Sequence, residues 1–191
     1  MFIIAGLYKG LKLKTPKGSQ TRPTSSRLRE AVFNICQFKI EGCEFLDLFA
    51  GSGAMGLEAI SRRAQSITFV DNHRECIQCI KENIKHLKIE KECQILQLDI
   101  FKSLEYLARN DQSFDIIYAD PPYHQGEKDI SLSFNTRLIE WIDTHALLKP
   151  EGVLFIEENL RYPPHLKTLN TLKLKESRKF GTVLLQQYQK I

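Results

Sequence analysis

From residue 44 to residue 158 the sequence alternates short apolar runs with longer segments of helical periodicity, and no other feature limits the fold as strongly. The short runs are rich in Ile, Leu, Val and Phe, which is typical of strands buried on both faces. The longer segments repeat apolar residues every three or four positions, as helices do. This alternation predicts an α/β protein with a mostly parallel sheet that helices cover on both faces. We expect strands at residues 45–49, 66–71, 93–99, 114–120 and 152–158, and helices near residues 54–63, 73–88, 101–109 and 131–145.

The two ends of the chain depart from this alternation. Residues 2–14 alternate around a Lys9-Gly10 step that suits a tight turn, which predicts a short basic β-hairpin. After Pro23, a Thr or Ser cap and apolar residues at helical spacing predict an N-terminal helix. Near the C-terminus, two extended runs separated by residues 179–181 predict a pair of strands that closes one edge of the sheet.

With 191 residues, of which 42% are hydrophobic, the chain can bury one sizeable core. No internal repeat divides it, so we predict a single domain over residues 1–191, with a basic hairpin and helix at residues 1–42 and the core at residues 43–191. Its longest apolar runs fall far short of the roughly 18 residues that a membrane span needs. The first residues lack the regions of a secretory signal, so we expect a soluble, cytoplasmic monomer with no membrane partner.

The five cysteines form an odd set that suits a reducing compartment, and we interpret them as free thiols. Cys76 and Cys79 make one CxxC pair, but no second pair and no histidine pair follows at zinc-finger spacing. We therefore expect these two side chains to pack in the interior. The five histidines are scattered along the chain, so no metal site is expected.

Basic residues concentrate at both ends of the chain, although the net charge is only +4. Residues 1–42 carry a net charge of +6, residues 43–159 carry −8, and residues 160–191 carry +6. A run of charge is often only solvated surface, but its recurrence at both ends favours a face that binds a polyanion. The candidate nucleic-acid contacts in the N-terminal flank are Lys9, Lys12, Arg22, Arg27 and Arg29.

A glycine-rich turn, GSGAMG at residues 51–56, follows the first predicted strand and opens a helix. A GxGxxG of this kind is only moderately specific, and it also fits the pyrophosphate of a dinucleotide. Asp47 in the preceding strand would repel a pyrophosphate, whereas it would attract the sulfonium and ammonium groups of S-adenosylmethionine. We therefore predict S-adenosylmethionine as the cofactor, bound around Asp47, Gly51, Ser52 and Gly53.

Two further aspartates end the next two predicted strands, Asp71 at 20 residues beyond Gly51 and Asp99 in QLDI. Each alone is best explained as a helix cap or a solvated strand end. Three carboxylates at the ends of three successive strands favour a ligand site, because ligands of open α/β sheets bind at that edge. We expect Asp71 to accept both ribose hydroxyls, and Asp99, beside Ile100, to meet the adenine amino group.

The quartet Asp120-Pro121-Pro122-Tyr123 directly follows the fourth predicted strand. Adjacent prolines are poor choices there, because each removes a backbone donor and fixes φ near about −65°. A Pro-Pro stop in a plain loop is the alternative. The Asp120 carboxylate and the Pro121 carbonyl could together accept both N–H bonds of a planar exocyclic amine. Tyr123 would offer a flat face on which an extruded base stacks.

With these motifs the chain resembles the class I S-adenosylmethionine-dependent methyltransferases, and its DPPY resembles the branch that methylates amino groups. The segments IIAGLYKGLKL, RPTSSRLREAVFN, LDLFAGSGAMGLEA and DIIYADPPY, in this order, are similar to the RsmD family of 16S ribosomal RNA guanine-N2 methyltransferases. The resemblance covers essentially the whole chain. It implies a Rossmann-like, mostly parallel seven-stranded sheet with an antiparallel edge strand. It also implies a cofactor site at Asp47, Gly51, Ser52, Gly53, Asp71 and Asp99, a guanine site at Asp120, Pro121, Pro122 and Tyr123, and an approach to cofactor or RNA by Arg22 and Thr24.

The resemblance implies methylation of a guanine N2 amine in a partly assembled small ribosomal subunit. The expected mechanism is direct in-line transfer to a flipped-out base, with no covalent enzyme intermediate. Three alternatives stay open: a DNA methyltransferase acting on adenine N6 or cytosine N4, a dinucleotide-dependent oxidoreductase, and a non-catalytic RNA-binding module with the same fold.

Overall fold

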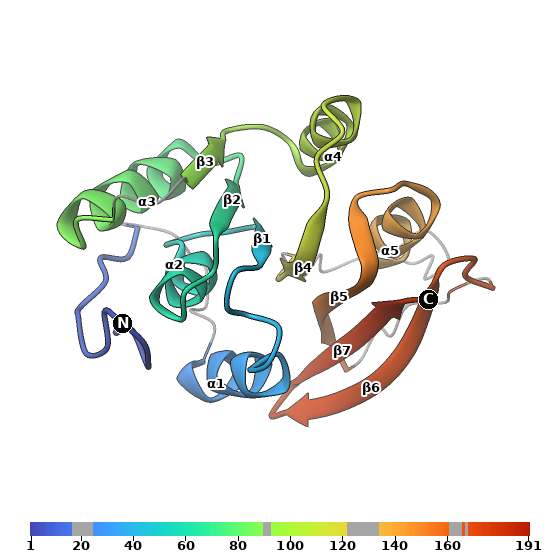
Figure 1. Ribbon diagram of the computed structural model, residues 1–191, viewed down its shortest axis with the longest axis horizontal. Coiled ribbons are helices and arrows are strands. Elements are labelled where there is room, and N and C mark those ends of the chain that lie inside the picture. Colours follow the sequence, from blue (N-terminus) through green and yellow to red (C-terminus); the bar gives the residue numbers. More distant parts are fainter. Residues whose placement is uncertain (17–24, 90–92, 122–133, 161–165, 167) are drawn as a thin grey trace.

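The computed structural model describes residues 1–16, 25–89, 93–121, 134–160, 166 and 168–191. Within these ranges, seven strands form one sheet in the order β3-β2-β1-β4-β5-β7-β6 (Figure 1). The strands from β1 to β5 pair in parallel, and β7 runs antiparallel to both of its neighbours. The predicted mostly parallel sheet and its closing pair of strands are confirmed. The strands are β1 (Glu44–Leu48), β2 (Ser66–Val70), β3 (Cys93–Leu96), β4 (Phe114–Ala119), β5 (Leu148–Asn159), β6 (Leu172–Phe180) and β7 (Val183–Lys190).

The helices that the structure describes cover both faces of the sheet (Figure 1). They are α1 (Ser26–Ile35), α2 (Ala54–Ser61), α3 (Arg74–His86), α4 (Ile100–Arg109) and α5 (Phe134–Thr144). Val32 of α1 and Leu57 of α2 share one buried cluster with Phe45 of β1. Leu104 of α4 belongs to the second buried cluster, with Leu46 of β1. Because consecutive strand residues point to opposite faces, β1 is buried on both sides, as its continuous apolar sequence predicts.

The predicted N-terminal hairpin is wrong. Phe2 and Lys12 form an isolated antiparallel bridge, and the structure describes no strand pair in residues 1–16. The physical reason lies in α2, where the carboxylate of Glu58 accepts hydrogen bonds from the backbone N–H groups of Ile4 and Ala5 at 2.7 and 3.0 Å. Backbone donors that bind a neighbouring helix are not available to a strand ladder, so the segment folds as a bent strap over α2.

The predicted N-terminal helix is confirmed as α1. Its N-cap is Ser25, whose hydroxyl oxygen accepts a hydrogen bond of 3.2 Å from the N–H of Leu28. A side-chain oxygen at this position satisfies one of the four backbone donors that a helix leaves unpaired at its start. The cap therefore fixes the residue at which α1 begins.

All five cysteines are free thiols, as predicted. Cys76 and Cys79 are both buried on α3, which agrees with packing in the interior. Burial raises the pKa of Cys36 and of Cys43 to about 12, so both stay protonated at neutral pH. In the part of the chain that the structure describes, none of the helices has the length and apolar character of a membrane span.

Candidate functional site

Three aspartates meet at the carboxyl edge of the sheet, where β1 and β4 are neighbours in space but not in sequence. Asp47 lies in β1, Asp71 directly follows β2, and Asp120 directly follows β4. Leu48, the last residue of β1, is aligned with the last residues of both neighbouring strands, so Asp71 and Asp120 flank the end of β1 at the same level. Ligands of open α/β sheets bind at such a reversal of strand order.

Asp47 is buried at this edge, with only 1% of its surface exposed. Its Oδ2 atom accepts a hydrogen bond of 2.9 Å from the backbone N–H of Gly56 in α2. Burial, together with the negative charges of Asp71 and Asp120, raises its pKa to about 7. A carboxyl group held in this way favours a cationic ligand, because a positive charge would stabilise its ionised form. The buried carboxyl group of Asp47 therefore fits a sulfonium or ammonium group of a ligand better than a phosphate.

The turn between β1 and α2 is built around positive φ angles. Phe49, Gly51 and Gly53 have φ values of 61°, 55° and 77°, and Gly53 is the N-cap of α2. Glycine adopts this conformation without strain, which explains the residue type at the second and third of these positions. The N–H of Gly51 donates to Oδ2 of Asp71 at 2.9 Å, so the loop is fixed to the end of β2.

Gly56 permits a close approach of α2 to the sheet. A Cβ atom at this position would lie 2.3 Å from Cε1 of Phe69 and 2.8 Å from Cγ2 of Ile67, both in β2. Only glycine allows the helix to pack so closely, and this closeness places the Gly56 N–H against Asp47.

The second carboxylate, Asp71, is buried and binds backbone groups through both oxygens. Besides its bond to the loop, its Oδ1 accepts the N–H of His73 at 2.9 Å and lies 3.2 Å from Nδ1 of the same residue. With Cys76 these residues form a group whose ligand-type atoms lie within 4.8 Å of one another. Burial, followed by the charge of Asp71, raises the pKa of the Cys76 thiol to about 12, which opposes metal binding as a thiolate. Our expectation of no metal site stays a prediction.

Asp99 lies at the N-terminus of α4 and is exposed. Its Oδ1 caps the helix by accepting the N–H groups of Phe101 and Lys102 at 3.0 and 3.4 Å. Ile100, the first residue of α4, is buried in the second core cluster. The helix cap that the sequence offered as the plainer interpretation is thus present, and contacts of Asp99 and Ile100 with an adenine stay predictions.

The predicted amine-binding segment is described only in its first half. Asp120 is half-buried and Pro121 is buried, directly after β4, whereas Pro122 and Tyr123 lie outside the described residues. The position of Asp120 is defined by its strand, because Ala119 is aligned with Ile156 of β5. The side chain and carbonyl at positions 120 and 121 therefore follow the end of a rigid central strand.

Two buried acids, Glu157 and Glu158, were not expected from the sequence. Burial raises the pKa of Glu157 and of Glu158, at the end of β5, to about 8, and the charge of Asp120 adds to the effect at Glu157. Glu157 accepts a hydrogen bond from the hydroxyl of Tyr118, two residues before Asp120 in the chain. The sequence signal that could have identified them is the pair of consecutive acids that ends the apolar run GVLFIEE.

An aromatic cluster at the same edge was also missed. The ring centroids of Phe49 and Phe101 lie 5.5 and 5.3 Å from that of Phe134, and the guanidinium of Arg137 lies over the Phe101 ring at 4.6 Å. All three rings are half-buried. They come from three separate segments of the chain, so no local pattern in the sequence could bring them together.

The structure corrects one candidate RNA contact. Arg29 is only 1% exposed, and its Nη2 donates a hydrogen bond of 2.6 Å to the carbonyl of Phe2, while its Nε lies 3.8 Å from the Glu58 carboxylate. It therefore anchors the N-terminal strap and cannot reach RNA. Lys9, Lys12 and Arg27 are exposed, so contacts with RNA by these three stay predictions. Arg22 and Thr24 lie outside the described residues.

Asn83 of α3 joins the strap to the glycine loop. Its Nδ2 donates to the carbonyl of Ser52 at 3.0 Å and to that of Lys14 at 3.1 Å, and its Oδ1 accepts the N–H of Lys14 at 2.8 Å. The side chain is fully buried. One amide on the apolar face of an amphipathic helix was the only sequence signal, and its partners lie 31 and 69 residues away.

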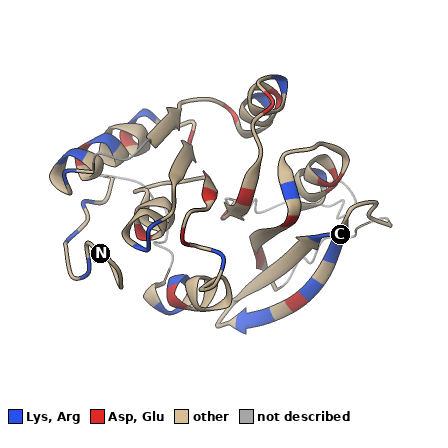
Figure 2. Ribbon diagram, viewed as in Figure 1, with Lys and Arg blue, Asp and Glu red and all other residues tan. Residues whose placement is uncertain are grey.

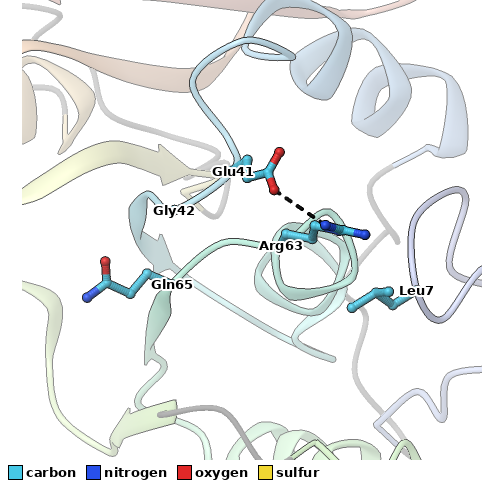
Figure 3. Close-up of a pocket in the computed structure, with 5 residues that line it drawn as sticks. All are labelled: Leu7, Glu41, Gly42, Arg63 and Gln65. Atoms are coloured by element: carbon cyan, nitrogen blue, oxygen red, sulfur yellow. Dashed lines mark ion pairs between the residues drawn. The ribbon is translucent and has the colours of Figure 1, made fainter.

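A surface hollow of about 670 Å³ lies elsewhere, lined by Leu7, Glu41, Gly42, Arg63 and Gln65 (Figure 3). Figure 3 shows the ion pair between Arg63 and Glu41, whose closest atoms are 3.5 Å apart. Gly42 and Gln65 precede β1 and β2, so the hollow faces the amino ends of these strands. It therefore lies at the opposite end of the sheet from the three aspartates.

Comparison with known proteins agrees with this geometry. The model of a family described as "Conserved hypothetical protein 95" matches residues 1–189. The chain is 32% identical over 190 residues to the "Putative rRNA methyltransferase YlbH" of Bacillus subtilis, covering 100% of this chain and 99% of that protein. It is 34% identical over 191 residues to "Ribosomal RNA small subunit methyltransferase D" of Haemophilus influenzae, covering 98% and 92%.

A solved structure extends the likeness to three dimensions. The structure named "Putative methyltransferase yhhF", from Escherichia coli, superposes with a TM-score of 0.80 at 28% identity, covering 100% of this chain and 97% of that one. The mixed seven-stranded sheet described above is therefore the sheet of a class I methyltransferase.

Proposed function

Because the chain belongs to the RsmD-like family whose model spans residues 1–189, we propose that it transfers a methyl group from S-adenosylmethionine to the N2 amine of a guanine in small-subunit (16S) ribosomal RNA. At the coarser level it is an S-adenosylmethionine-dependent rRNA methyltransferase. We propose that the substrate is ribosomal RNA in a partly assembled small subunit. The observation that carries the proposal is the meeting of Asp47, Asp71 and Asp120 at the carboxyl edge of one sheet.

The cofactor is S-adenosylmethionine, which when bound supplies an electrophilic methyl group on a sulfonium. We assign its binding to the glycine loop and to the first two aspartates. The buried carboxylate of Asp47, whose pKa is raised to about 7, would balance the positive charge of the ligand. Asp71, held rigid by Gly51 and His73, would orient the ribose hydroxyls, and Asp99 with Ile100 would meet the adenine.

The target amine is assigned to Asp120 and Pro121, with Pro122 and Tyr123 completing the site as the sequence predicts. The amine of guanine is weakly nucleophilic, because its lone pair is delocalised into the ring. Two fixed acceptors on its N–H groups would favour the pyramidal form, in which the lone pair points away from the ring. Positioning of this kind raises the rate by holding the reacting atoms in line, without a covalent enzyme intermediate.

Release of the amine proton does not need a strong base, because the methylated nitrogen is strongly acidic before the proton leaves. Asp120 is the acceptor next to that nitrogen in this assignment. Asp120 is half-buried, so the proton would pass from its carboxylate to solvent. The charge of Asp120 contributes to the raised pKa of Glu157, about 8, so these two carboxyl groups interact electrostatically.

The proposal is tested by incubating the purified chain and labelled S-adenosylmethionine with three substrates in parallel: unmodified small subunits, free small-subunit rRNA and duplex DNA. We expect label in the subunits, with less in the free RNA and none in DNA. Label in DNA alone would favour the DNA amino-methyltransferase that the sequence left open. Binding of RNA without transfer to any substrate would favour a non-catalytic module.

A further inference from the structure

Strand β6 is exposed over almost its whole length. Residues 173–179 are exposed on both faces of the sheet, in contrast to β1, β2 and β4, which are buried at nearly every position. Among the described residues β6 pairs only with β7, so it forms one edge of the sheet, with its outer backbone groups turned away from the molecule (Figure 1). An edge of this kind presents unpaired N–H and C=O groups, and its N–H groups can donate hydrogen bonds to an added ligand.

The exposed segment is strongly basic. Lys173, Lys175, Arg178 and Lys179 lie within seven residues, with Glu176 as the acid among them (Figure 2). Glu176 forms an ion pair with Arg178, in which Nε and Oε1 are 2.8 Å apart, so the three lysines carry the net positive charge. Lys175 occupies an irregularity in the β6–β7 register, between Leu174 and Glu176.

The strand register brings one end of this basic strand to the level of the candidate site. Arg178 is aligned with Leu185 of β7, and Leu185 is aligned with Glu157 of β5. In turn, Ile156 of β5 is aligned with Ala119 of β4, so the residues that follow them, Glu157 and Asp120, lie at the same level. Asp120 and the end of β6 that carries Arg178 therefore lie on one line across the sheet. Three strand spacings separate β6 from β4, or about 14 Å.

The candidate site itself is unsuited to phosphate. Asp71 and Asp120 lie there with the buried acids Asp47 and Glu157, and the carboxylate charge at this edge would repel a nucleic-acid backbone. A substrate RNA must therefore insert its base among acids while its phosphates are held elsewhere. The nearest basic strand at the same level is β6.

We propose that β6 binds the phosphate backbone of the substrate RNA and leads the strand to the base site at Asp120. The inference rests on the proposed function and deepens it, because it names the surface that holds the substrate. Lysines and outward backbone N–H groups are the usual contacts to phosphate oxygens. A stacked strand advances about 3.4 Å per nucleotide, so the 14 Å between β6 and β4 corresponds to about four nucleotides beside the flipped base.

The test compares two triple variants of the full chain with equal loss of charge. In the first, Lys173→Gln, Lys175→Gln and Lys179→Gln neutralise β6 and leave the Arg178–Glu176 pair intact. In the second, Lys81→Gln, Lys85→Gln and Lys88→Gln neutralise exposed lysines on α3 and the turn after it. Helix α3 lies beside β3, at the edge of the sheet opposite to β6 (Figure 1). The probe is a small-subunit rRNA fragment, titrated at several salt concentrations, with thermal unfolding and S-adenosylmethionine binding measured on the same samples.

Each phosphate contact contributes about 0.7 to the slope of log K against log salt for a single strand. We expect the β6 variant to bind RNA about 10- to 50-fold more weakly at 0.15 M salt. The magnitude of its slope of log K against log salt should be smaller by about two. The α3 variant should bind within about twofold of the unaltered chain. Unfolding temperature and cofactor affinity should stay unchanged in both.

Equal RNA affinity of the two variants would overturn the inference. The β6 lysines would then serve only to keep an exposed edge from pairing with other chains, which aggregation of the β6 variant would reveal. If the unaltered chain does not bind RNA, the inference fails as well. Failure of the proposed function can be distinguished from failure of this inference. The proposed function fails if RNA bound through β6 receives no methyl group, whereas the role of β6 is tested by RNA affinity alone.

Discussion

The side-chain amide of Asn83 donates a hydrogen bond of 3.0 Å to the carbonyl of Ser52 and so fixes the glycine loop to α3. The same amide exchanges two hydrogen bonds with the backbone of Lys14, at the end of the N-terminal strap. The loop that we assign to the cofactor is therefore supported from outside the sheet, by α3 and the N-terminal strap. The shape of the cofactor site depends on this support.

Replacing the amide should loosen the loop. Asn83→Ala removes the three hydrogen bonds of a fully buried side chain, and we expect it to lower the free energy of unfolding by about 2–4 kcal/mol. S-adenosylmethionine should bind about tenfold more weakly, because the loop must be ordered on binding. Urea denaturation and calorimetric titration measure the two effects. Asn110→Ala, which removes an exposed amide bonded to Tyr106, is the matched control and should change stability by less than about 0.5 kcal/mol. Equal effects of the two substitutions would refute the supporting role.

The raised pKa of Asp47 makes stability depend on pH. Its folded pKa of about 7 exceeds the ordinary value of 3.8, so the folded chain holds the proton more tightly between these values. Rising pH through this window therefore removes stability, by up to about 4 kcal/mol, and Asp47→Asn should abolish that loss. Urea denaturation at pH 5 and pH 8 should show the variant gaining on the unaltered chain at the higher pH. A constant difference would contradict the assignment, and Asp111→Asn, at an exposed position, serves as the control.

Cofactor affinity should change in the opposite sense to stability. Ionised Asp47 attracts a cationic ligand, so S-adenosylmethionine should bind more tightly as the pH rises through about 7. Asp47→Asn should bind it weakly and without this pH dependence. Titration of both proteins with S-adenosylmethionine between pH 6 and pH 8.5 checks the expectation. A pH dependence that persists in the variant would place the titrating group elsewhere.

Asp120 is expected to act on the reacting amine and not on the cofactor. Asp120→Ala should lower kcat by about 10²- to 10³-fold, as the loss of one fixed hydrogen-bonding group does in other sites. S-adenosylmethionine should still bind within about threefold of the unaltered affinity. Single-turnover methyl transfer and calorimetric titration separate the two quantities. Glu105→Ala, on the exposed face of α4, is the control, and unchanged turnover in Asp120→Ala would show that the role is wrongly assigned.

Gly56→Ala should push α2 away from the sheet. The added methyl group would lie 2.3 Å from the Phe69 ring, and we expect a loss of about 1–3 kcal/mol in the free energy of unfolding together with weaker cofactor binding. Gly181→Ala has a strained φ of 62° but open space around the new atom, so it should cost only about 1 kcal/mol and leave cofactor binding unchanged. Similar losses in both variants, by urea denaturation, would mean that the close packing at Gly56 has no effect of its own.

The central sheet could be predicted from the sequence because its cause is local. Strands such as residues 114–119 are apolar at almost every position, and the helices between them repeat apolar residues at their own period. The glycine loop and the aspartates at the strand ends follow from the same pattern, since parallel strands bring their carboxyl ends to one edge. The structure adds the order of the strands, which makes β1 and β4 neighbours and so brings Asp47 and Asp120 to adjacent strands. The sequence only suggested this.

The errors arose where distant residues decide the local structure. The strap at residues 1–16 has the alternation of a hairpin, but Glu58 takes two of its backbone donors. Arg29 lies in a basic stretch, yet it faces the same buried carboxylate and the carbonyl of Phe2. Periodicity carries no information about a partner more than 25 residues away, so a buried ion pair of this kind looks like exposed charge in the sequence.

The most direct test of the account is the chemical identity of the product. Small subunits methylated by the chain with labelled S-adenosylmethionine would be digested to nucleosides and compared by mass spectrometry with authentic methylated standards. We expect the label to elute as N2-methylguanosine. Label in a ring-methylated guanosine, in N6-methyladenosine or in a ribose-methylated nucleoside would contradict the proposed roles of Asp120 and Pro121.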